Sequence, residues 1–510
     1  MKSMSTIFAL AASALLLASC AERNAGIPAE LREIMRAGRE RALPPLHPDF
    51  NEMLTNFLTP DLCAETDSRV ARHIQWESTR LLTAAGLPSR GVSAAISPRA
   101  LISHAEIRDE LCFLFDLLRY GYVGYQHFGG DAVFLPLRDS MLESLALMRD
   151  PLPVREYLDR LLVPAFRGVI YDNHFQIHNV TMRARDYRLH MSRDFVLRRD
   201  RAGDFVTEID GAARRVLGTT LRDGTPVDGI LPTLTREGEL AWMFGLLAAD
   251  GDRQAWEIVA LLECARTGER SSLVASLAHV GNYNPTSNPV LETREVGGVP
   301  ILVNRTMSVR SWHNARMEFA QSGIALRDKP VLVLDLRGHS GGGDFANEWI
   351  SGYTGRMPNR ALAFQRFQLN SSVAHTLLGR ATSRNPYFYP SWNRHNAVAP
   401  QRDLIPNENL LIVLTDKRVS SGGDLFVGDL RQLENALFVG TNTHGNILSG
   451  GIVRSRLPHS GIDIIFGQEL HVRPDLSQFE GIGFLPDLWV PPGESLERVL
   501  AFIERYGLNR

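Results

Sequence analysis

Ser421 stands where a serine could act as a nucleophile, between an apolar run and an amphipathic segment. Residues 410–415 are apolar up to a final threonine, which predicts a strand buried on both faces. Residues 425–433 repeat apolar side chains at helical spacing. Ser421 is therefore expected at a helix N-terminus, where unpaired N–H groups and the helix dipole stabilise negative charge. This placement suits acyl transfer through a serine, although the same pattern is also typical of a simple helix N-cap.

A second glycine-rich segment could complete such a site. Residues 331–336 form another short apolar run, interrupted only by Asp335, and the glycine-rich residues 338–343 follow it. Glycines at a strand end let backbone N–H groups face a ligand without side chains in the way. Two such loops, about 80 residues apart, could bring an oxyanion hole and a nucleophile to one place.

Other kinds of chemistry find little support in the sequence. The histidines are dispersed and no His-Glu-x-x-His cluster occurs, so neither a metal nor any other cofactor is expected. The four cysteines have no metal-type spacing, and one disulfide at most is expected. A net charge of −2 gives no reason to expect nucleic acid as a partner.

The chain of 510 residues has room for two or three domains. We expect a tether over residues 21–50, which lack a sustained period, and a helical region over residues 51–184. A mixed middle region over residues 185–296 combines short alternating runs with a helical stretch near residues 238–268. An α/β domain with buried strands is expected over residues 297–510.

The first 20 residues predict export. Lys2 gives a positive start, and the apolar residues 7–17 are too few to span a membrane, so they indicate a signal peptide. Residues 17–20 (Leu-Ala-Ser-Cys) resemble a bacterial lipobox, which implies cleavage before Cys20 and a lipid anchor on it. The protein would then lie in the cell envelope and face the periplasm, at the outer rather than the inner membrane because Ala21 follows the cysteine. An ordinary cleavable signal is the alternative.

Four segments of the C-terminal half resemble, in the same order, segments of the tail-specific (C-terminal-processing) protease family, to which the tricorn core and interphotoreceptor-retinoid-binding-protein-like domains are related. They are the Asp-Leu-Arg and glycine segment at 335–342, the serine segment at 415–424, the Thr-x-Gly turn at 438–445 and the Gly-Ile to Pro-Asp segment at 480–490. The resemblance implies an α/β, crotonase/ClpP-like peptidase core over residues 297–510, with polypeptide as substrate. The middle region shows no recognisable PDZ signature, which leaves an absent and a divergent PDZ module as alternatives.

The resemblance also assigns site residues. Ser421 matches the nucleophile, and the N–H of Gly422 matches one oxyanion donor. The second donor matches an N–H near Ser340 or Gly341, and we take Gly341. Many family members carry a lysine base just after the Thr-x-Gly turn, whereas Asn446 stands there in this chain.

The general base is therefore sought among the histidines. Other branches of the family carry a histidine on the strand before the Asp-Leu-Arg segment, and this chain has none there. His444 is the first choice, because it lies in the turn where the lysine branch has its base and titrates near neutral pH. A partly exposed turn histidine without a catalytic role is the alternative for His444. His127, His174 and His339 are further candidates for the base, and Lys417 is expected to be a solvated lysine at a strand end.

Three functions stay open. The first is a serine endopeptidase that acts on unstructured C-terminal tails or misfolded exported polypeptides. The second is a pseudo-peptidase that binds peptide without cutting it, because the usual lysine is missing. The third is another acyl-transfer enzyme on a crotonase-like scaffold, which the Pro-Asp segment and the export signal disfavour.

Overall fold

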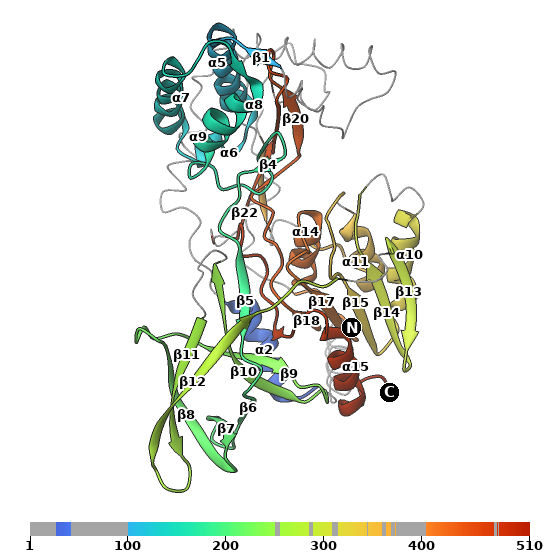
Figure 1. Ribbon diagram of the computed structural model, residues 1–510. Helices are drawn as coiled ribbons and strands as arrows, with labels where there is room; N and C mark the ends of the chain where they lie inside the picture. Colours follow the sequence, from blue (N-terminus) through green and yellow to red (C-terminus); the bar gives the residue numbers. More distant parts are fainter. Residues whose placement is uncertain are drawn as a thin grey trace, which may run out of the picture.

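The computed structural model describes residues 27–41, 100–249, 256–284, 289–308, 315–343, 345–359, 364–368, 373, 404–473, 477 and 479–510, and Figure 1 shows their arrangement. Within these ranges, none of the helices combines the length and hydropathy that a transmembrane span requires. The predicted signal peptide and Cys20 lie outside the described residues.

A six-stranded sheet forms the centre of the C-terminal half. Its order is β13 (Leu291–Val296), β14 (Val299–Asn304), β15 (Val331–Asp335), β17 (Leu410–Thr415), β18 (Ala436–Gly440) and β23 (Leu488–Trp489). The β13–β14 pair is antiparallel, and all other neighbouring pairs are parallel. The two apolar runs predicted from the sequence are thus the two central strands, and the α/β fold class is confirmed.

Strands β15 and β17 are buried on both faces because helices cover each side of the sheet. Leu332 and Leu334 belong to the apolar cluster shared with α10 (Ala315–Leu326), α11 (Ala346–Thr354) and α14 (Gly422–Leu430). Val331 and Val333 belong to the opposite cluster, shared with α15 (Ser495–Tyr506) and α2 (Ala29–Glu40). Successive strand side chains point to opposite faces, so a strand between two helical layers needs apolar residues at every position.

The described part of the expected tether is instead a packed helix. Helix α2 buries Leu31 and Met35 in the same cluster as the central sheet, and Figure 1 shows it between the barrel and the C-terminal half. Leu31, Ile34 and Met35 have the three- and four-residue spacing of one helix face. This short pattern, among many charged residues, was overlooked in the sequence.

The middle region is a β-barrel rather than a mixture of strands and helix. Its strands are β5 (Tyr187–Met191), β6 (Leu197–Arg199), β7 (Phe205–Ile209), β8 (Ala212–Leu221), β9 (Ile230–Leu234), β10 (Leu240–Ala249), β11 (Trp256–Cys264) and β12 (Arg270–His279). Strand β5 pairs with both β12 and β10, so the ladder from β5 through β12, β11, β8, β7, β6 and β10 closes. The helix expected near residues 238–268 is therefore wrong. Strand β10 is buried along most of its length, which removes the alternation of an exposed strand.

A helical lobe lies at the other end of the molecule (Figure 1). It contains α5 (His104–Gly121), α6 (Gly124–His127), α7 (Gly130–Ala146), α8 (Val154–Tyr157) and α9 (Val163–Phe166), in line with the helical pattern of this region. Strand β3 (Gln176–Ile177) then pairs with β4 (Val180–Thr181) and with β21 (Asp463–Phe466), which in turn pairs with β20 (Val453–Arg456). The loop before β3 is thereby held against the C-terminal half of the chain.

Candidate active site

Ser421 lies at the start of α14 in a backbone conformation that residues other than glycine rarely adopt. Its φ is 54° and its ψ is −118°, and its side chain makes no capping hydrogen bond to the helix. The N-cap explanation of this serine is therefore not supported. Backbone strain of this kind persists only where the surrounding structure enforces it, and it concentrates at active sites.

His174 contacts the hydroxyl of Ser421. Its Nε2 lies 3.2 Å from Ser421 Oγ, although the two residues are 247 positions apart. Burial lowers the pKa of His174, and the carboxylate of Asp172 opposes part of this shift. The imidazole is consequently neutral at neutral pH, the state in which a general base accepts the proton of a serine.

Asp172 fixes the loop that carries His174. Its Oδ1 accepts the backbone N–H of His174 at 2.8 Å, and its Oδ2 accepts the hydroxyl of Tyr122 at 2.8 Å. Both Asp172 and Tyr122 are fully buried. Strand β3 begins two residues after His174, so the base has a rigid support on either side.

Glu480 ties the same loop to the C-terminal half. Its Oε1 accepts the N–H of Asn173 at 2.8 Å. Its Oε2 accepts the N–H groups of Ile447 and Leu448, each at 2.8 Å. Burial and the nearby Asp172 carboxylate raise the pKa of Glu480 to about 8. Sequence analysis missed this residue, although it begins one of the four segments that carry the family resemblance.

The glycine-rich loop after β15 lies directly against Ser421. A Cβ on Gly341 would come within 2.9 Å of the Cβ of Ser421, so only glycine permits this approach. Most amides of the loop are already used: Gly338 donates to Asp416 Oδ1, His339 to Leu336 O, Ser340 to Arg305 O, Gly341 to His339 Nδ1 and Gly343 to Met307 O. Within the described chain, the N–H of Gly342 has no acceptor.

The free amides of Gly342 and Gly422 lie beside one another. The nitrogen of Gly342 would be 3.2 Å from a Cβ built on Gly422, so the two backbones are in close contact. Like the Gly342 N–H, the Gly422 N–H has no acceptor among the described residues. Two unpaired amides next to a serine hydroxyl are the arrangement that stabilises an oxyanion. Gly422 takes the place expected for it, whereas the N–H of Gly341 is directed to His339 at 3.1 Å. The free amide of this loop is therefore that of Gly342, one residue beyond the predicted Gly341.

His339 supports the glycine-rich loop instead of serving as the base. Its ring is fully buried, and burial lowers its pKa to about 3. Its Nδ1 accepts the Gly341 N–H, and its carbonyl accepts the N–H of Ser420 at 3.0 Å. His339 therefore connects the glycine-rich loop to the serine loop.

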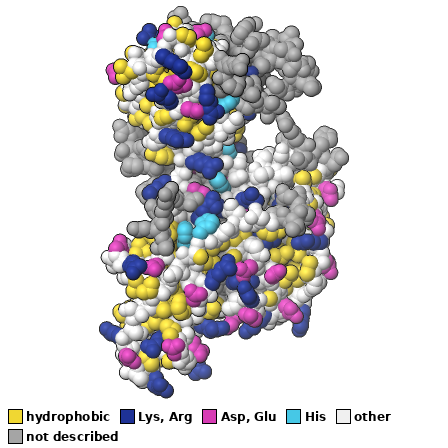
Figure 2. Space-filling view, in the orientation of Figure 1, with side chains coloured by type: hydrophobic (Ala, Val, Ile, Leu, Met, Phe, Trp, Pro, Cys, Tyr) yellow, Lys and Arg dark blue, Asp and Glu magenta, His cyan; other side chains and the backbone are white. Residues whose placement is uncertain are grey.

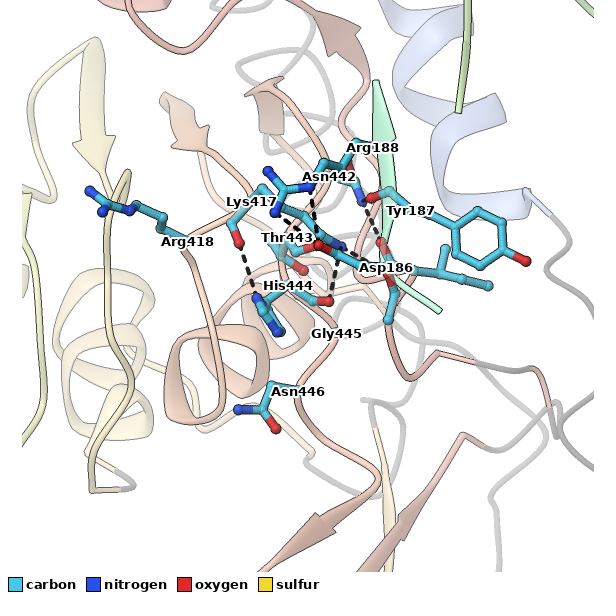
Figure 3. Close-up of polar contacts among 12 residues, drawn as sticks. Asp186, Tyr187, Arg188, Lys417, Arg418, Asn442, Thr443, His444, Gly445 and Asn446 are labelled. Carbon is cyan, nitrogen blue, oxygen red and sulfur yellow. Dashed lines mark hydrogen bonds and ion pairs between the residues drawn. The ribbon is translucent and has the colours of Figure 1, made fainter. Parts of the chain in front are cut away.

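Lys417 is buried rather than solvated. Its Nζ donates to the carbonyls of Thr443, His444 and Gly481 at 3.2, 3.1 and 2.8 Å, and lies 2.9 Å from Asp186 Oδ1 (Figure 3). Only 5% of the residue is exposed. Three carbonyls and a carboxylate satisfy the buried ammonium, which explains how a charged side chain is accommodated there.

His444, the first choice for the base, contacts Lys417 and not Ser421 in the described structure. Its Nδ1 lies 3.3 Å from the carbonyl of Lys417 (Figure 3). Its backbone N–H donates to Val419 O at 2.7 Å. Burial and the Lys417 ammonium lower the pKa of His444 to about 4. The geometry thus brings His174, named only as an alternative, to the nucleophile in place of His444.

Two further predicted positions, Asn446 and His127, have other described contacts. Asn446, in the place of the family lysine, donates its backbone N–H to Asp424 Oδ2 at 3.1 Å. His127 ends α6 in the helical lobe, with its ring 4.8 Å from that of Phe128. In the described part of the chain, no group of three or more His, Cys, Asp or Glu side chains could hold a metal ion.

Comparison with known proteins gives a family match for part of the chain. Residues 306–490 match the model of peptidase family S41, a range that contains Gly342, Ser421 and Gly422. A search of curated proteins gave no significant match. Mature CPAF complexed with lactacystin is a similar solved structure, with 14% identity and a TM-score of 0.39 over 79% of this chain and 97% of that chain. The photosystem II D1 C-terminal processing protease has 13% identity and a TM-score of 0.32 over 77% of this chain and 97% of that chain. The tricorn protease has 14% identity and a TM-score of 0.35 over 79% of this chain and 37% of that chain.

We expect His339→Asn to make the fold less sensitive to acid. An unfolded histidine titrates near pH 6.5, whereas His339 stays neutral in the fold down to about pH 3. Below pH 6.5 the unfolded state therefore binds a proton that the folded state lacks. The free energy of unfolding falls for this reason as the pH drops, by about 2 kcal/mol at pH 5. Asparagine keeps an acceptor for the Gly341 N–H but does not titrate.

Urea unfolding of both proteins at pH 7.5 and pH 5 measures this difference. The loss of stability between the two pH values should be smaller in the variant by about 2 kcal/mol, because all other groups cancel in the comparison. Equal losses in the two proteins would mean that His339 is protonated in the fold.

Proposed function

Residues 306–490 belong to peptidase family S41, a family of serine peptidases, and on this premise we propose that the protein is a tail-specific serine endopeptidase that cuts exported polypeptides. The observation that carries the proposal is the 3.2 Å contact between His174 Nε2 and Ser421 Oγ. Beside this pair lie the unpaired amides of Gly342 and Gly422. A nucleophile, a base and an oxyanion hole are the parts that peptide hydrolysis needs.

The geometry supports a two-step reaction. Ser421 Oγ attacks the carbonyl carbon of the scissile peptide bond while His174 Nε2 takes the hydroxyl proton. The N–H groups of Gly342 and Gly422 donate to the oxygen of the tetrahedral intermediate. His174 then passes the proton to the leaving amine, and the C–N bond breaks. In the second step, His174 takes a proton from water while the water oxygen attacks the acyl carbon on Ser421. The C–O bond to Ser421 Oγ then breaks, His174 returns the proton to this oxygen, and the acid product leaves.

His174 supplies the base that the sequence lacks at Asn446. This pairing favours an active peptidase over a pseudo-peptidase, whose main support was the missing lysine. Asp172 and Glu480 act in the proposal as positioning residues, since they bind the backbone of residues 173 and 174 and not the serine. Their role is to hold the imidazole within reach of Ser421 Oγ.

The cellular location is a separate part of the proposal. Its support is the sequence of residues 1–20, which has the form of a lipoprotein signal ending in Cys20. The mature protein would be a lipoprotein that faces the periplasm from the outer membrane. Its substrates would then be polypeptides that have been exported.

Ser421→Ala should remove nearly all peptide hydrolysis and all labelling by a serine-directed fluorophosphonate. The melting temperature should change little, because the hydroxyl makes no capping hydrogen bond to α14. Ser420→Ala is the matched control and should keep both labelling and hydrolysis. Unchanged hydrolysis by Ser421→Ala would contradict the assignment of the nucleophile.

His174→Ala should lower kcat by a factor of roughly 10³ or more with little change in KM, because a base that acts only on the reacting proton is lost. His444→Ala should keep most of the activity. In the wild type, kcat/KM should fall as the pH drops through the pKa of His174, which burial places below 6.5. Protonated imidazole cannot accept the serine proton, so activity is lost on the acid side. If His444→Ala lost far more activity than His174→Ala, His444 would be the base instead.

Cys20→Ser should leave a form that is unprocessed or soluble, whereas the native protein should fractionate with the outer membrane. Mass spectrometry of the native N-terminus should show an acylated cysteine. A native protein found in the cytosol, or one without acyl mass on its N-terminus, would rule out the lipoprotein.

A further inference from the structure

A cavity of about 840 Å³ lies between the barrel and α2. Ile34 and Ala37 line it from α2, and Leu246 lines it from β10. Trp489 lines it from β23, the edge strand of the central sheet. Small-molecule sites usually have volumes of about 300–1,000 Å³, and barrels of about eight strands are wide enough to hold one small ligand. A molecule bound here would therefore contact the barrel, the helix and the central sheet together.

Two residues that line this cavity have a buried indole N–H without an acceptor. They are Trp256, at the start of β11, and Trp489, and neither indole nitrogen has a hydrogen-bond partner among the described residues. Trp489 is only 2% exposed. Buried polar groups in folded proteins are nearly always hydrogen-bonded. Donors of this kind beside a cavity therefore indicate a bound molecule that brings an acceptor.

The charge on the cavity wall is mainly positive. Arg41, Arg185 and Arg199 line the cavity, whereas Asp228 is the single acidic residue among the described residues of its wall. The face of the barrel shown in Figure 2 differs, since Lys and Arg side chains there are interspersed with Asp and Glu. Within the described ranges, the side chains of Arg41 and Arg185 form no hydrogen bond or ion pair. Burial lowers the pKa of Arg41, so its guanidinium would be stabilised by a bound anion.

The third arginine, Arg199, is oriented by aromatic rings. Its guanidinium lies 5.1 Å from the ring centre of Phe205 and 5.3 Å from that of Trp242, and both of these residues also line the cavity. A carboxylate oxygen of Glu30 on α2 is 3.9 Å away, which is too far for a hydrogen bond. Stacking leaves the N–H groups at the edge of a guanidinium available, so Arg199 can donate to an anion.

The donors and acceptors of the wall distinguish between kinds of ligand. Arginine and the tryptophan indole donate hydrogen bonds and accept none. A peptide would bring backbone N–H groups that need acceptors, and among the described side chains of the wall only Asp228 and Tyr187 have an oxygen to offer. A carboxylate or phosphate brings acceptors alone, and an apolar chain attached to it would match side chains such as Ile34 and Leu246.

We propose that the cavity binds a single-chain anionic amphiphile, an apolar chain that ends in a carboxylate or a phosphate, as in a fatty acid or an alkyl phosphate. The head group accepts hydrogen bonds from donors of the wall, and the chain lies against its apolar side chains. Neither Ser421 nor His174 lines the cavity, so this site is separate from the proposed catalytic pair and does not depend on peptidase activity.

Displacement of cis-parinaric acid, a fluorescent fatty acid, tests the proposal. The full-length protein carries Cys20→Ser and Ser421→Ala, so that no acyl group of its own competes and no peptide is cut. Dodecanoate and dodecyl phosphate are compared with dodecanol, and we expect the better of the two anions to bind about tenfold more tightly than the alcohol. Which anion binds more tightly identifies the head group. No binding of the probe, or equal displacement by dodecanol, would overturn the proposal.

Variants of the same protein locate the binding. Arg41→Gln combined with Arg199→Gln should weaken binding of the preferred anion about tenfold and leave that of dodecanol unchanged. Arg201→Gln, on the exposed turn between β6 and β7, is the matched control and should bind the anion as before. Ala37→Phe, which fills part of the cavity, should weaken binding of anion and alcohol alike, and urea unfolding checks that each variant is folded. Unchanged anion binding by the double arginine variant would contradict the site.

An apolar peptide with a free C-terminal carboxylate, and the same peptide as its amide, separate a lipid ligand from a polypeptide end. Neither should displace the probe, because the wall offers few acceptors for peptide N–H groups. If the free peptide displaces it whereas dodecanoate and dodecyl phosphate do not, the cavity binds polypeptide ends and the proposal is wrong.

Discussion

The buried carboxylate of Asp335 is the interaction on which the active-site loops depend. Arg305 and Arg337 both bind it, with contacts of 2.7 to 2.9 Å, and Tyr283 stacks on the two guanidiniums. The carbonyl of Arg305 accepts the N–H of Ser340, so the same group places the loop that carries Gly342. Removing one partner from a buried ion pair costs about 3–5 kcal/mol, because the other charge stays buried. The position of the glycine-rich loop is thus fixed by one charged cluster at the end of β15.

A second set of buried groups joins the helical lobe, the barrel and the central sheet at one place. Glu480 binds backbone N–H groups on both sides of the boundary with the lobe. Lys417, at the end of β17, binds Asp186 at the entry to the barrel. Both side chains are almost completely buried, so they stabilise the structure only if every polar atom finds its partner. Glu480 binds the residue next to His174, and Lys417 lies four residues before Ser421, so the geometry of this pair depends on the docking of all three parts.

The sequence predicted the part of the site that is local in the chain. Ser421 and Gly422 follow a buried strand and begin a helix. The strand has a continuous apolar run and the helix has apolar residues at helical spacing, so both elements could be predicted. His174 could not be selected, because the pairing of β3 with β21 that brings it to Ser421 leaves no periodic signal. Lys417 looked solvated for a related reason: the carbonyls and the carboxylate that bind it come from distant segments. The helix predicted over β10 is wrong because burial of most of this strand removes the alternation on which a strand prediction depends.

The separation of 247 positions between base and nucleophile has a consequence for biosynthesis. Residue 174 is synthesised well before the serine loop, and strand β21, which pairs with β3, is synthesised after it, so the nascent chain carries an imidazole without its partner. Contacts of such high contact order form late in folding, since loop closure must be achieved before they contribute. Since the proposed base and nucleophile meet only in the folded chain, activity toward polypeptides requires the complete tertiary structure.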